Sequence, residues 1–500
     1  MGASSLGEPA TLLVTCGSAL YILRVTEASF SVPPSAPASV ERAKRELRRQ
    51  LGDSKLLEAE EAVARYARDE SEAEAEPPDV VVLAESREDI LTTLAIAERF
   101  RVPVTPRAGG TGRTGGAVPV ARGIVLSVSG MNQIREIDAR EGLAVVGPGV
   151  VLADLQRAVE AEGWFYPPDP NSLQTCQLGG NVAENAGGPR AFKYGVTRDY
   201  VLGMEAFLMG GQALSVGRRT RKGVTGYDVT ALLVGSEGTL AVLGDVTLRL
   251  IPKPASVMTL LISFASLTAA AGLVEAATAA RLVPRCFELL DRNTLAAMRA
   301  EGNPIDPRAE ALLLVEVDGE PAACERDAER LAALADDLGA LTVEVAQGEA
   351  PRERLWAARR AMSPAVRKMA KHKLSEDVVV PRQAMGELLS RVARVSEETQ
   401  IRTVTYGHAG DGNLHVNFLW DHEEERPKVE RSIERLFQAV VELRGTLSGE
   451  HGIGVLKAPY LPLEQSPQLI QLQRELKRVF DPQGLLNPGK IFPRVGHGAC

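Results

Sequence analysis

Cysteine is scarce in this chain. The five cysteines are scattered over 500 residues and form no C-x-x-C pair. This spacing indicates neither a disulfide framework nor a thiolate site for zinc or an iron–sulfur cluster, as expected of a protein in a reducing cytoplasm.

Basic residues are also outnumbered by acidic ones, with 57 Lys and Arg against 65 Asp and Glu. Because binding to nucleic-acid phosphates needs a concentrated basic surface, no nucleic-acid partner is expected.

Long apolar runs are missing as well. None approaches the roughly twenty residues that span a bilayer, so no transmembrane segment is expected. The chain is predicted to be cytoplasmic, with peripheral association with the inner membrane as the alternative. The stretch TLLVTCGSALYILRV near the start is apolar, but no basic segment precedes it and no clear cleavage site follows. We interpret residues 1–40 as a disordered extension and 494–500 as a tail.

Glycine, in contrast, is abundant and gathers in loops. The stretch PRAGGTGRTGGAVP contains the spacing G-x-G-x-x-G at Gly110, Gly112 and Gly115. In a Rossmann fold a helix follows this motif and contributes to the pyrophosphate site. Here the apolar, β-branched stretch GIVLSVSGM follows, which predicts a strand. We therefore reject the Rossmann fold and predict a loop that presents successive backbone N–H groups to an anion.

The predicted elements divide the chain into domains. Amphipathic helical segments, including SKLLEAEEAVARYARDE, are expected in 41–77, and a glycine-rich α/β domain is expected in 78–254. Prolines close the strand-like stretch GDVTLRLIPKP at the end of that domain. Strands and helices then alternate in a second domain at 255–493, with helices predicted at 267–281 and 321–338.

Six motifs occur along the chain in a fixed order. They are PRAGGTGRTGGAVP, LGGNVAENAGGPRAFKYGVTRDYV, GSEGTLAVL, YGHAGDGNLHVN, SGEHGIG and FDPQGLLNPGKIF. As a set they resemble the FAD-linked oxidases that share the fold of vanillyl-alcohol oxidase and p-cresol methylhydroxylase, in the branch of D-lactate dehydrogenase, D-2-hydroxyglutarate dehydrogenase and the glycolate oxidase flavin subunit. The resemblance implies an α+β protein with a FAD-binding domain of the p-cresol methylhydroxylase type, built from two α/β subdomains. It also implies a C-terminal α+β substrate domain with an antiparallel sheet.

The resemblance implies that the glycine loops bind FAD. The loop that begins at Arg107 would wrap the pyrophosphate, and the loops that begin at Gly179 would line the flavin and the ribityl chain. Val242 would lie near the adenine, and Asn487 would close the site. The implied FAD residues are Arg107, Gly109, Gly110, Thr111, Gly112, Gly115, Gly116, Gly179, Gly180, Asn181, Asn185, Gly188, Tyr194, Gly195, Thr197, Val242 and Asn487.

No histidine precedes His372. Many relatives attach FAD covalently to a histidine of the FAD-binding domain, and this chain offers none there. We therefore predict that its FAD is bound non-covalently and is released in full when the protein is denatured. The measurement is the flavin absorbance of the supernatant after acid precipitation. Flavin that stays with the precipitated chain would contradict the prediction.

The histidines of the C-terminal half include a metal-ligand pattern. His408 and His415 lie in GHAGDGNLHVN, and Glu450 directly precedes His451 in SGEHGIG. Two imidazoles and a carboxylate suit zinc, manganese or another divalent ion with open coordination sites. A hydrogen-bonded His/Glu cluster with a structural role is the alternative. The resemblance implies the first interpretation, with His408, His415 and Glu450 as metal ligands and His451 as the catalytic base.

An arginine-rich segment is expected to bind the substrate. The stretch PRERLWAARRAMSPAV begins with a proline, a good first helical residue, and places Arg352, Arg359 and Ser363 on one helical face. The resemblance implies that Arg359 binds the substrate carboxylate and that Ser363 is a second contact. It also implies the reaction: a D-2-hydroxy acid is oxidised to the 2-oxo acid by hydride transfer to flavin N5.

One stretch of the sequence narrows the range of possible substrates. KHKLSEDVVVPR is closer to the glycolate and lactate type than to the form whose lysine and tyrosine hold a second carboxylate, although Lys371 and Lys373 leave D-2-hydroxyglutarate open. D-lactate or glycolate is therefore the predicted substrate. The alternatives are the flavin subunit of a multi-subunit glycolate oxidase and a flavin-binding protein without turnover. Quinone, electron-transfer flavoprotein, cytochrome and oxygen stay open as electron acceptors, and a homodimer or partner subunits stay open as the assembly.

Overall fold

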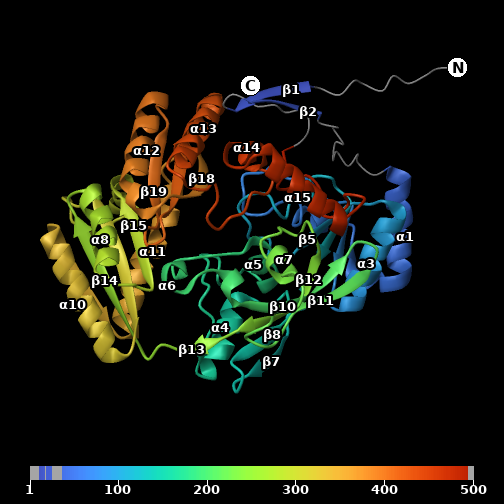
Figure 1. The fold of residues 1–500 in the computed structure, drawn as a ribbon, viewed down its shortest axis with the longest axis horizontal. Coiled ribbons are helices and arrows are strands. Elements are labelled where there is room, and N and C mark those ends of the chain that lie inside the picture. The colour runs from blue at the N-terminus through green and yellow to red at the C-terminus, as the bar shows by residue number, and fades with distance from the viewer. Residues whose placement is uncertain (1–10, 17–18, 25–35, 494–500) are drawn as a thin grey trace.

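The structure is a computed structural model, and it describes residues 11–16, 19–24 and 36–493. Figure 1 shows two domains side by side, the N-terminal domain in blue to green and the C-terminal domain in yellow to orange. Two final helices, α14 (Leu461–Glu464) and α15 (Pro467–Phe480), drawn in red, lie over the N-terminal domain.

The first sheet of the N-terminal domain has the strand order β3-β4-β6-β5. Strands β4, β6 and β5 are parallel, and helices α1 and α3 pack on one face of them through Leu47, Ile90 and Leu94. Val63 of the short helix α2 packs on the other face, which explains why these strands are apolar on both sides. The bounds are β3 Leu56–Leu57, β4 Val80–Leu83, β5 Val104–Arg107, β6 Ile124–Ser127, α1 Pro37–Leu51, α2 Glu60–Ala64 and α3 Arg87–Phe100.

The second sheet of this domain is antiparallel, with the order β11-β10-β12-β8-β7. Helices α4 and α5 bury Leu155 and Val182 in its core, and strands β9 and β13 form a small separate pair. The bounds are β7 Ile134–Asp138, β8 Leu143–Val146, β9 Trp164–Phe165, β10 Val201–Leu208, β11 Gln212–Gly217, β12 Val242–Arg249, β13 Ile251–Pro252, α4 Leu152–Ala161, α5 Leu178–Glu184, α6 Ala191–Tyr194 and α7 Val229–Leu233.

The C-terminal domain is built on an antiparallel sheet with the order β17-β14-β16-β15-β19-β20-β18. Helices α8, α10, α12 and α13 cover one face and α9 and α11 the other, so Leu289 and Leu290, neighbours on β15, pack into separate cores. The bounds are β14 Ser256–Phe264, β15 Cys286–Asp291, β16 Ala311–Gly319, β17 Ala340–Gln347, β18 His372–Val379, β19 Arg402–His408, β20 Asn413–Trp420, α8 Leu267–Ala279, α9 Arg292–Ala300, α10 Pro321–Asp337, α11 Glu349–Arg367, α12 Met385–Thr399 and α13 Arg426–Glu442.

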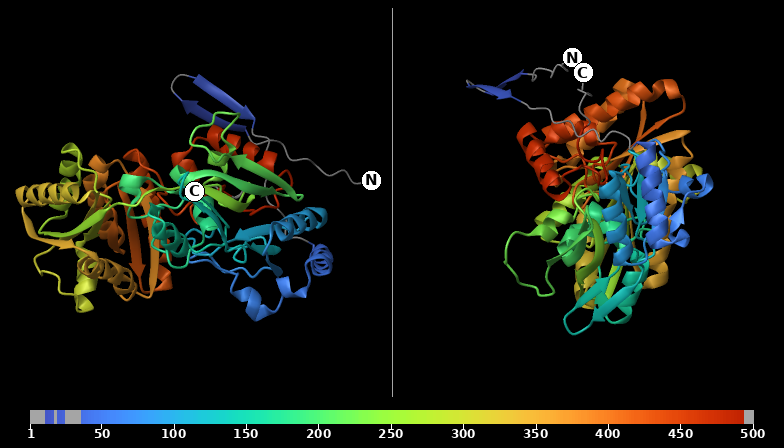
Figure 2. Two further views of the ribbon diagram at one scale, coloured as in Figure 1. Left: turned by 90° about the horizontal axis from the view of Figure 1, so that it is seen from below. Right: turned by 90° about the vertical axis from the view of Figure 1, so that its right-hand side faces the viewer.

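The last segment of the chain returns to the N-terminal domain. Lys477 Nζ on α15 donates to the carbonyl oxygen of Thr239 at 2.6 Å, and Asn487 N donates to that of Val104 at 2.7 Å. The sequence places these residues in the second domain, whereas in space they complete the first. Two views from other sides show the red helices against the green and blue elements (Figure 2).

The helices predicted from the sequence are confirmed in the C-terminal domain and only in part in the N-terminal region. Helix α1 begins at Pro37, earlier than the predicted start at residue 41. The helix predicted over SKLLEAEEAVARYARDE is wrong for most of its length, because Leu56 and Leu57 pair with β4 as a strand and only α2 is helical there. The helices predicted at 267–281 and 321–338 are confirmed as α8 and α10.

The predicted disordered extension includes a hairpin. Strands β1 (Thr11–Cys16) and β2 (Ala19–Arg24) pair antiparallel, as apolar, β-branched segments readily do. Disorder of the extension as a whole stays a prediction. The rest of the extension before α1 and the tail at 494–500 lie outside the described residues. Across the part of the chain that the structure describes, no helix combines the length and the apolar character needed to cross a bilayer.

Candidate active site between the two domains

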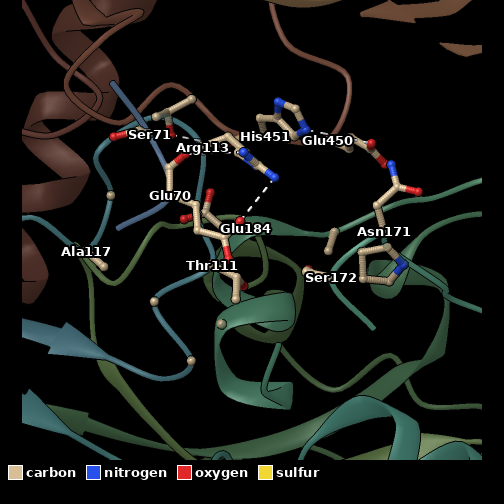
Figure 3. Close-up of a pocket in the computed structure, with 18 of the residues that line it drawn as sticks. Glu70, Ser71, Thr111, Arg113, Ala117, Asn171, Ser172, Glu184, Glu450 and His451 are labelled. Carbon is tan, nitrogen blue, oxygen red and sulfur yellow. Dashed lines mark hydrogen bonds and ion pairs between the residues drawn. The ribbon is translucent and has the colours of Figure 1, made fainter. Parts of the chain in front are cut away.

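A cavity of about 540 Å³ lies where the two domains meet. Its walls come from the loop between β5 and β6, from α5, from α11 and from the SGEHGIG segment. Figure 3 shows Glu450 and His451 on one side of this pocket, with Thr111, Arg113 and Ser172 around it. The segments that the sequence assigned to FAD and to substrate therefore face the same space.

The glycine loop forms one wall as a backbone cradle. Gly110 has a φ of 68°, and a Cβ added to Gly109 would lie 2.8 Å from the carbonyl oxygen of Thr175, so these two positions do not accommodate a larger residue without strain. Thr114 Oγ1 donates to the carbonyl oxygen of His451 at 3.0 Å, which ties the loop to the SGEHGIG segment. The predicted FAD residues that line the cavity are Arg107, Gly109, Gly110, Thr111, Gly112, Gly116, Gly179, Gly180, Asn181 and Val242.

The other predicted FAD residues are not among those that line the cavity, and they support the lining loops instead. Tyr194 donates its hydroxyl to Asp318 of the C-terminal domain at 2.7 Å, so it joins the domains. Asn185 ends α5 with a φ of 54°, and Thr197 Oγ1 donates to the carbonyl oxygen of Ala186. The full set outside the lining is Gly115, Asn185, Gly188, Tyr194, Gly195, Thr197 and Asn487.

Asn487 does not line the cavity, but it forms hydrogen bonds with the glycine loop. Its Nδ2 donates to the carbonyl oxygens of Gly116 and Glu237 at 3.0 and 2.7 Å. Its Oδ1 and the Oε2 atom of Glu184 are buried without a hydrogen-bond partner. Burying such atoms costs free energy unless a partner is supplied, so unpartnered polar atoms beside a glycine cradle fit a bound polar cofactor such as FAD.

The predicted metal ligands come together. His408 ends β19 and His415 lies on the paired strand β20, and one ligand atom from each of these and from Glu450 lies within 4.8 Å of the others. Glu450 Oε1 is 3.3 Å from His408 Nε2 and 3.5 Å from His415 Nε2. His415 Nε2 and Glu450 Oε2 are buried with no hydrogen-bond partner. Two buried, unpartnered ligand atoms within a His/His/Glu set fit a divalent metal ion.

His451 lies against this cluster. Its ring stacks on that of His415, with 5.3 Å between the ring centroids, and its Nε2 is 3.9 Å from Glu450 Oε1. Its side chain is 20% exposed and lines the cavity. Burial lowers the pKa of His451, although the carboxylates of Asp377 and Glu450 act in the opposite direction. The lowered pKa favours the neutral imidazole that a general base requires.

Asp377 on β18 holds the SGEHGIG segment in place. Its Oδ2 accepts the backbone N–H groups of Gly449, Glu450 and His451 at 2.9, 2.8 and 3.0 Å. Burial alone would raise the pKa of Asp377, but the neighbouring His451 and Lys457 side chains and these hydrogen bonds hold it well below its usual range. The sequence prediction missed this residue. The signal was present, since an aspartate that interrupts the apolar strand SEDVVV must have a buried partner.

Arg359 projects from α11 into the same cavity. Its side chain is 6% exposed, and its Nε and Nη2 donate to Glu288 Oε2 at 2.9 and 2.6 Å. Ser363, one turn further along α11, also lines the cavity. Arg352, predicted on the same helical face, instead donates to Glu316 at 2.9 Å and is not among the lining residues. The cavity thus receives one buried arginine and one hydroxyl from this helix.

Further residues line the cavity. The sequence analysis named Lys373 only as a residue that leaves D-2-hydroxyglutarate open, and it missed Tyr406. Lys373 Nζ is 3.4 Å from the Tyr406 hydroxyl, and both side chains line the cavity although β18 and β19 are not paired with each other. Only the strand order brings them together. Arg113 and Glu184 could have been found, because both lie inside motifs already assigned to FAD. The additional lining residues of interest are Arg113, Asn171, Ser172, Glu184, Trp356, Lys373 and Tyr406.

The fold and the site define a flavin-dependent oxidoreductase, and the comparisons confirm this class. Residues 78–217 match the FAD binding domain, and residues 253–491 match the C-terminal domain of FAD linked oxidases. The chain is 40% identical to the glycolate oxidase subunit GlcD of Bacillus subtilis, over 83% of this chain and 89% of that one. It belongs to the FAD-linked oxidases, in the group of GlcD, D-lactate dehydrogenase and D-2-hydroxyglutarate dehydrogenase.

Other relatives are similar to most of the chain. The D-lactate dehydrogenase of Archaeoglobus fulgidus is 37% identical over 83% of this chain and 92% of its own length. The D-2-hydroxyglutarate dehydrogenase of Stutzerimonas stutzeri is 31% identical over 89% and 98%. A solved p-cresol methylhydroxylase superposes with a TM-score of 0.78 at 16% identity, over 93% of this chain and 99% of its own. That likeness confirms the predicted fold.

Proposed function

We propose that this FAD-linked oxidoreductase oxidises a small 2-hydroxy acid, D-lactate or glycolate, to the 2-oxo acid. One observation carries the proposal: a glycine cradle, a His/His/Glu cluster, a histidine base and a buried arginine all meet at one cavity. The names of the GlcD and D-lactate dehydrogenase relatives support the substrate class. The D configuration for a chiral substrate rests on those relatives.

Arg359 would bind the substrate carboxylate. Nε and Nη2 of its guanidinium donate to Glu288, and Nη1 contacts only Met362 Sδ, at 3.8 Å, among the described residues. A guanidinium held along one edge can offer its other edge to a second carboxylate. Ser363 would add a hydroxyl contact from the next turn of α11. Together they would anchor the acid end of the substrate.

His451 would remove the proton of the substrate hydroxyl at its ring nitrogen. It is neutral in the ground state because burial lowers its pKa, and it lies next to Glu450. His408, His415 and Glu450 would hold a divalent metal ion, zinc or manganese. When bound, such an ion would supply a Lewis acid that lowers the pKa of the substrate hydroxyl, and FAD would supply the hydride acceptor. The residues of this chain would supply orientation.

D-2-hydroxyglutarate is a second candidate substrate, favoured by one pair of residues. Lys373 and Tyr406 line the cavity with their polar atoms 3.4 Å apart, and Lys373 Nζ also lies 6.0 Å from the centre of the Tyr406 ring. An ammonium and a hydroxyl beside the substrate arginine could hold a second carboxylate. The named activity of the Stutzerimonas stutzeri relative supports this alternative.

Onward electron transfer is proposed to need another molecule. The five scattered cysteines offer no iron–sulfur relay in this chain, and GlcD relatives are named as subunits of a glycolate oxidase. We therefore favour a partner subunit or a separate acceptor, such as a quinone, an electron-transfer flavoprotein or a cytochrome, with oxygen as the alternative.

The test is anaerobic bleaching of the purified yellow protein by D-lactate, glycolate and D-2-hydroxyglutarate, each added separately. We expect full reduction of the flavin by D-lactate or glycolate. The matched variant Lys373→Met should leave their reduction rates within about threefold, because removing a side chain that the substrate does not touch leaves transition-state stabilisation unchanged. Full bleaching by D-2-hydroxyglutarate alone, with a large loss in Lys373→Met, would instead establish the second candidate. Flavin that none of the acids bleaches would contradict the proposed function.

A further inference from the structure

Glu288 is a fully buried carboxylate that contacts two groups of the proposed site at once. Its Oε2 accepts from Arg359, and its Oε1 forms a short hydrogen bond with His408 Nδ1. The register of the sheet makes this contact, since Glu288 on β15 lies directly opposite His408 on β19. One side chain therefore connects the substrate arginine with a metal-ligand histidine.

We propose that Glu288 is a positioning residue that sets the tautomer of His408 and the orientation of Arg359; the inference rests on the proposed function of both residues. An imidazole that donates Nδ1–H to a carboxylate presents its Nε2 lone pair on the opposite side. In the structure His408 Nε2 faces the ligand set and forms a hydrogen bond of 3.3 Å with Glu450 Oε1, the contact that a bound metal ion would replace. Glu288 thus holds His408 in the form that can ligate a metal ion.

The arginine is preorganised by the same carboxylate. Glu288 Oε2 accepts from both Nε and Nη2 of Arg359, and the guanidinium also lies 5.7 Å from the centre of the Tyr406 ring. The side chain is fixed before the substrate arrives, so little rotamer freedom is lost on binding. Glu288 also balances the charge of an arginine that is almost fully buried, which keeps Arg359 inside the cavity when no acid is bound.

Glu316 on the neighbouring strand β16 provides a matched comparison. It is also buried, and its Oε1 accepts from Arg352 Nη2 and Trp356 Nε1, both at 2.9 Å. It contacts neither His408 nor Arg359 among its recorded partners. The Glu316→Gln variant therefore measures the effect of removing a buried carboxylate from this sheet when the surroundings of the proposed metal ligands stay the same.

The experiment measures zinc affinity by competition with a chromophoric chelator, on FAD-loaded protein. In Glu288→Gln the amide oxygen is drawn to Arg359, which has only donors, and the amide nitrogen then faces His408 Nδ1. That arrangement selects the tautomer with hydrogen on Nε2. We expect the Kd for zinc to rise about 10- to 100-fold, the range for loss of a supporting carboxylate, with a raised KM, while Glu316→Gln leaves the Kd for zinc unchanged.

A second pair of variants keeps the test decisive if Glu288→Gln folds poorly. The double variant Glu288→Met/Arg359→Met replaces a buried ion pair by apolar groups of similar size, which is tolerated better than removing one partner. Its Kd for zinc should exceed that of Arg359→Met alone by the same 10- to 100-fold. Equal zinc affinities in these two variants would overturn the inference. Wild-type protein that binds no divalent metal would instead overturn the metal site of the proposed function.

Discussion

Replacing His451 by asparagine is expected to lower kcat for 2-hydroxy acid oxidation by about 100- to 10,000-fold, the usual contribution of a general base. The physical reason is that the variant keeps a polar side chain beside Glu450 but has no group that can take the hydroxyl proton. The zinc content should be unchanged, because His451 is not one of the three clustered ligands. The measurement is the rate of anaerobic flavin reduction at saturating substrate, together with FAD and metal content.

The matched control for this variant is His422→Asn. His422 is exposed at the end of β20 and does not line the cavity, so its replacement should leave the reduction rate at the wild-type value. If His451→Asn reduces its flavin within about threefold of the wild-type rate, His451 is not the base. Loss of zinc together with rate would mean that His451 acts as a ligand.

Replacing Arg359 by methionine is expected to raise KM strongly and to lower kcat/KM by about 30- to 5,000-fold, the equivalent of the 2–5 kcal/mol typical for a buried, hydrogen-bonded charge pair. Arg359 is 6% exposed and donates to Glu288 from two nitrogens, so its guanidinium is held in place at the cavity, and methionine supplies no hydrogen-bond donor there. The measurement is steady-state kinetics with the acid that bleaches the flavin. Parallel measurement of the melting temperature separates lost binding from lost stability.

Arg352→Met is the control on the same helix. Arg352 lies two turns before Arg359 and makes a comparable ion pair with Glu316, but it does not line the cavity. We expect a similar loss of stability with an unchanged KM. An unchanged KM in Arg359→Met itself would remove that residue from the substrate site.

Two sets of polar contacts join the domains that form the cavity. Glu237 of the N-terminal domain accepts the backbone N–H groups of Ile453 and Gly454 at 2.8 and 2.7 Å. The Asp318 carboxylate of the C-terminal domain accepts a hydrogen bond from the Tyr194 hydroxyl and forms an ion pair with Lys193. Buried polar contacts of this kind must be fully satisfied to be favourable, so they fix how the domains meet. This junction holds the proposed base His451 and the glycine cradle on facing walls of the cavity.

Much of the fold followed from local patterns. The strand after the glycine loop is confirmed as β6, and it was predictable because GIVLSVSGM is apolar and β-branched. The helix predicted after residue 54 is wrong because Leu56 and Leu57 gain more from pairing with β4 than from continuing a helix. Tertiary pairing overrides a weak local preference in such cases.

The resemblance of short motifs to the FAD-linked oxidases was enough to predict the FAD-linked class and to name His408, His415, Glu450 and Arg359 as candidates. The glycine cradle was predictable from glycines at short spacings in one loop. Only the tertiary structure decided which motif residues face the cavity and which support it, as Tyr194 does by contacting Asp318. It also decided the contact of Glu288 with His408, which are 120 residues apart, and the anchoring of the SGEHGIG segment by Asp377. The physical reason is that strand register and domain packing join distant residues, and both are set by the burial of whole faces rather than by any local motif.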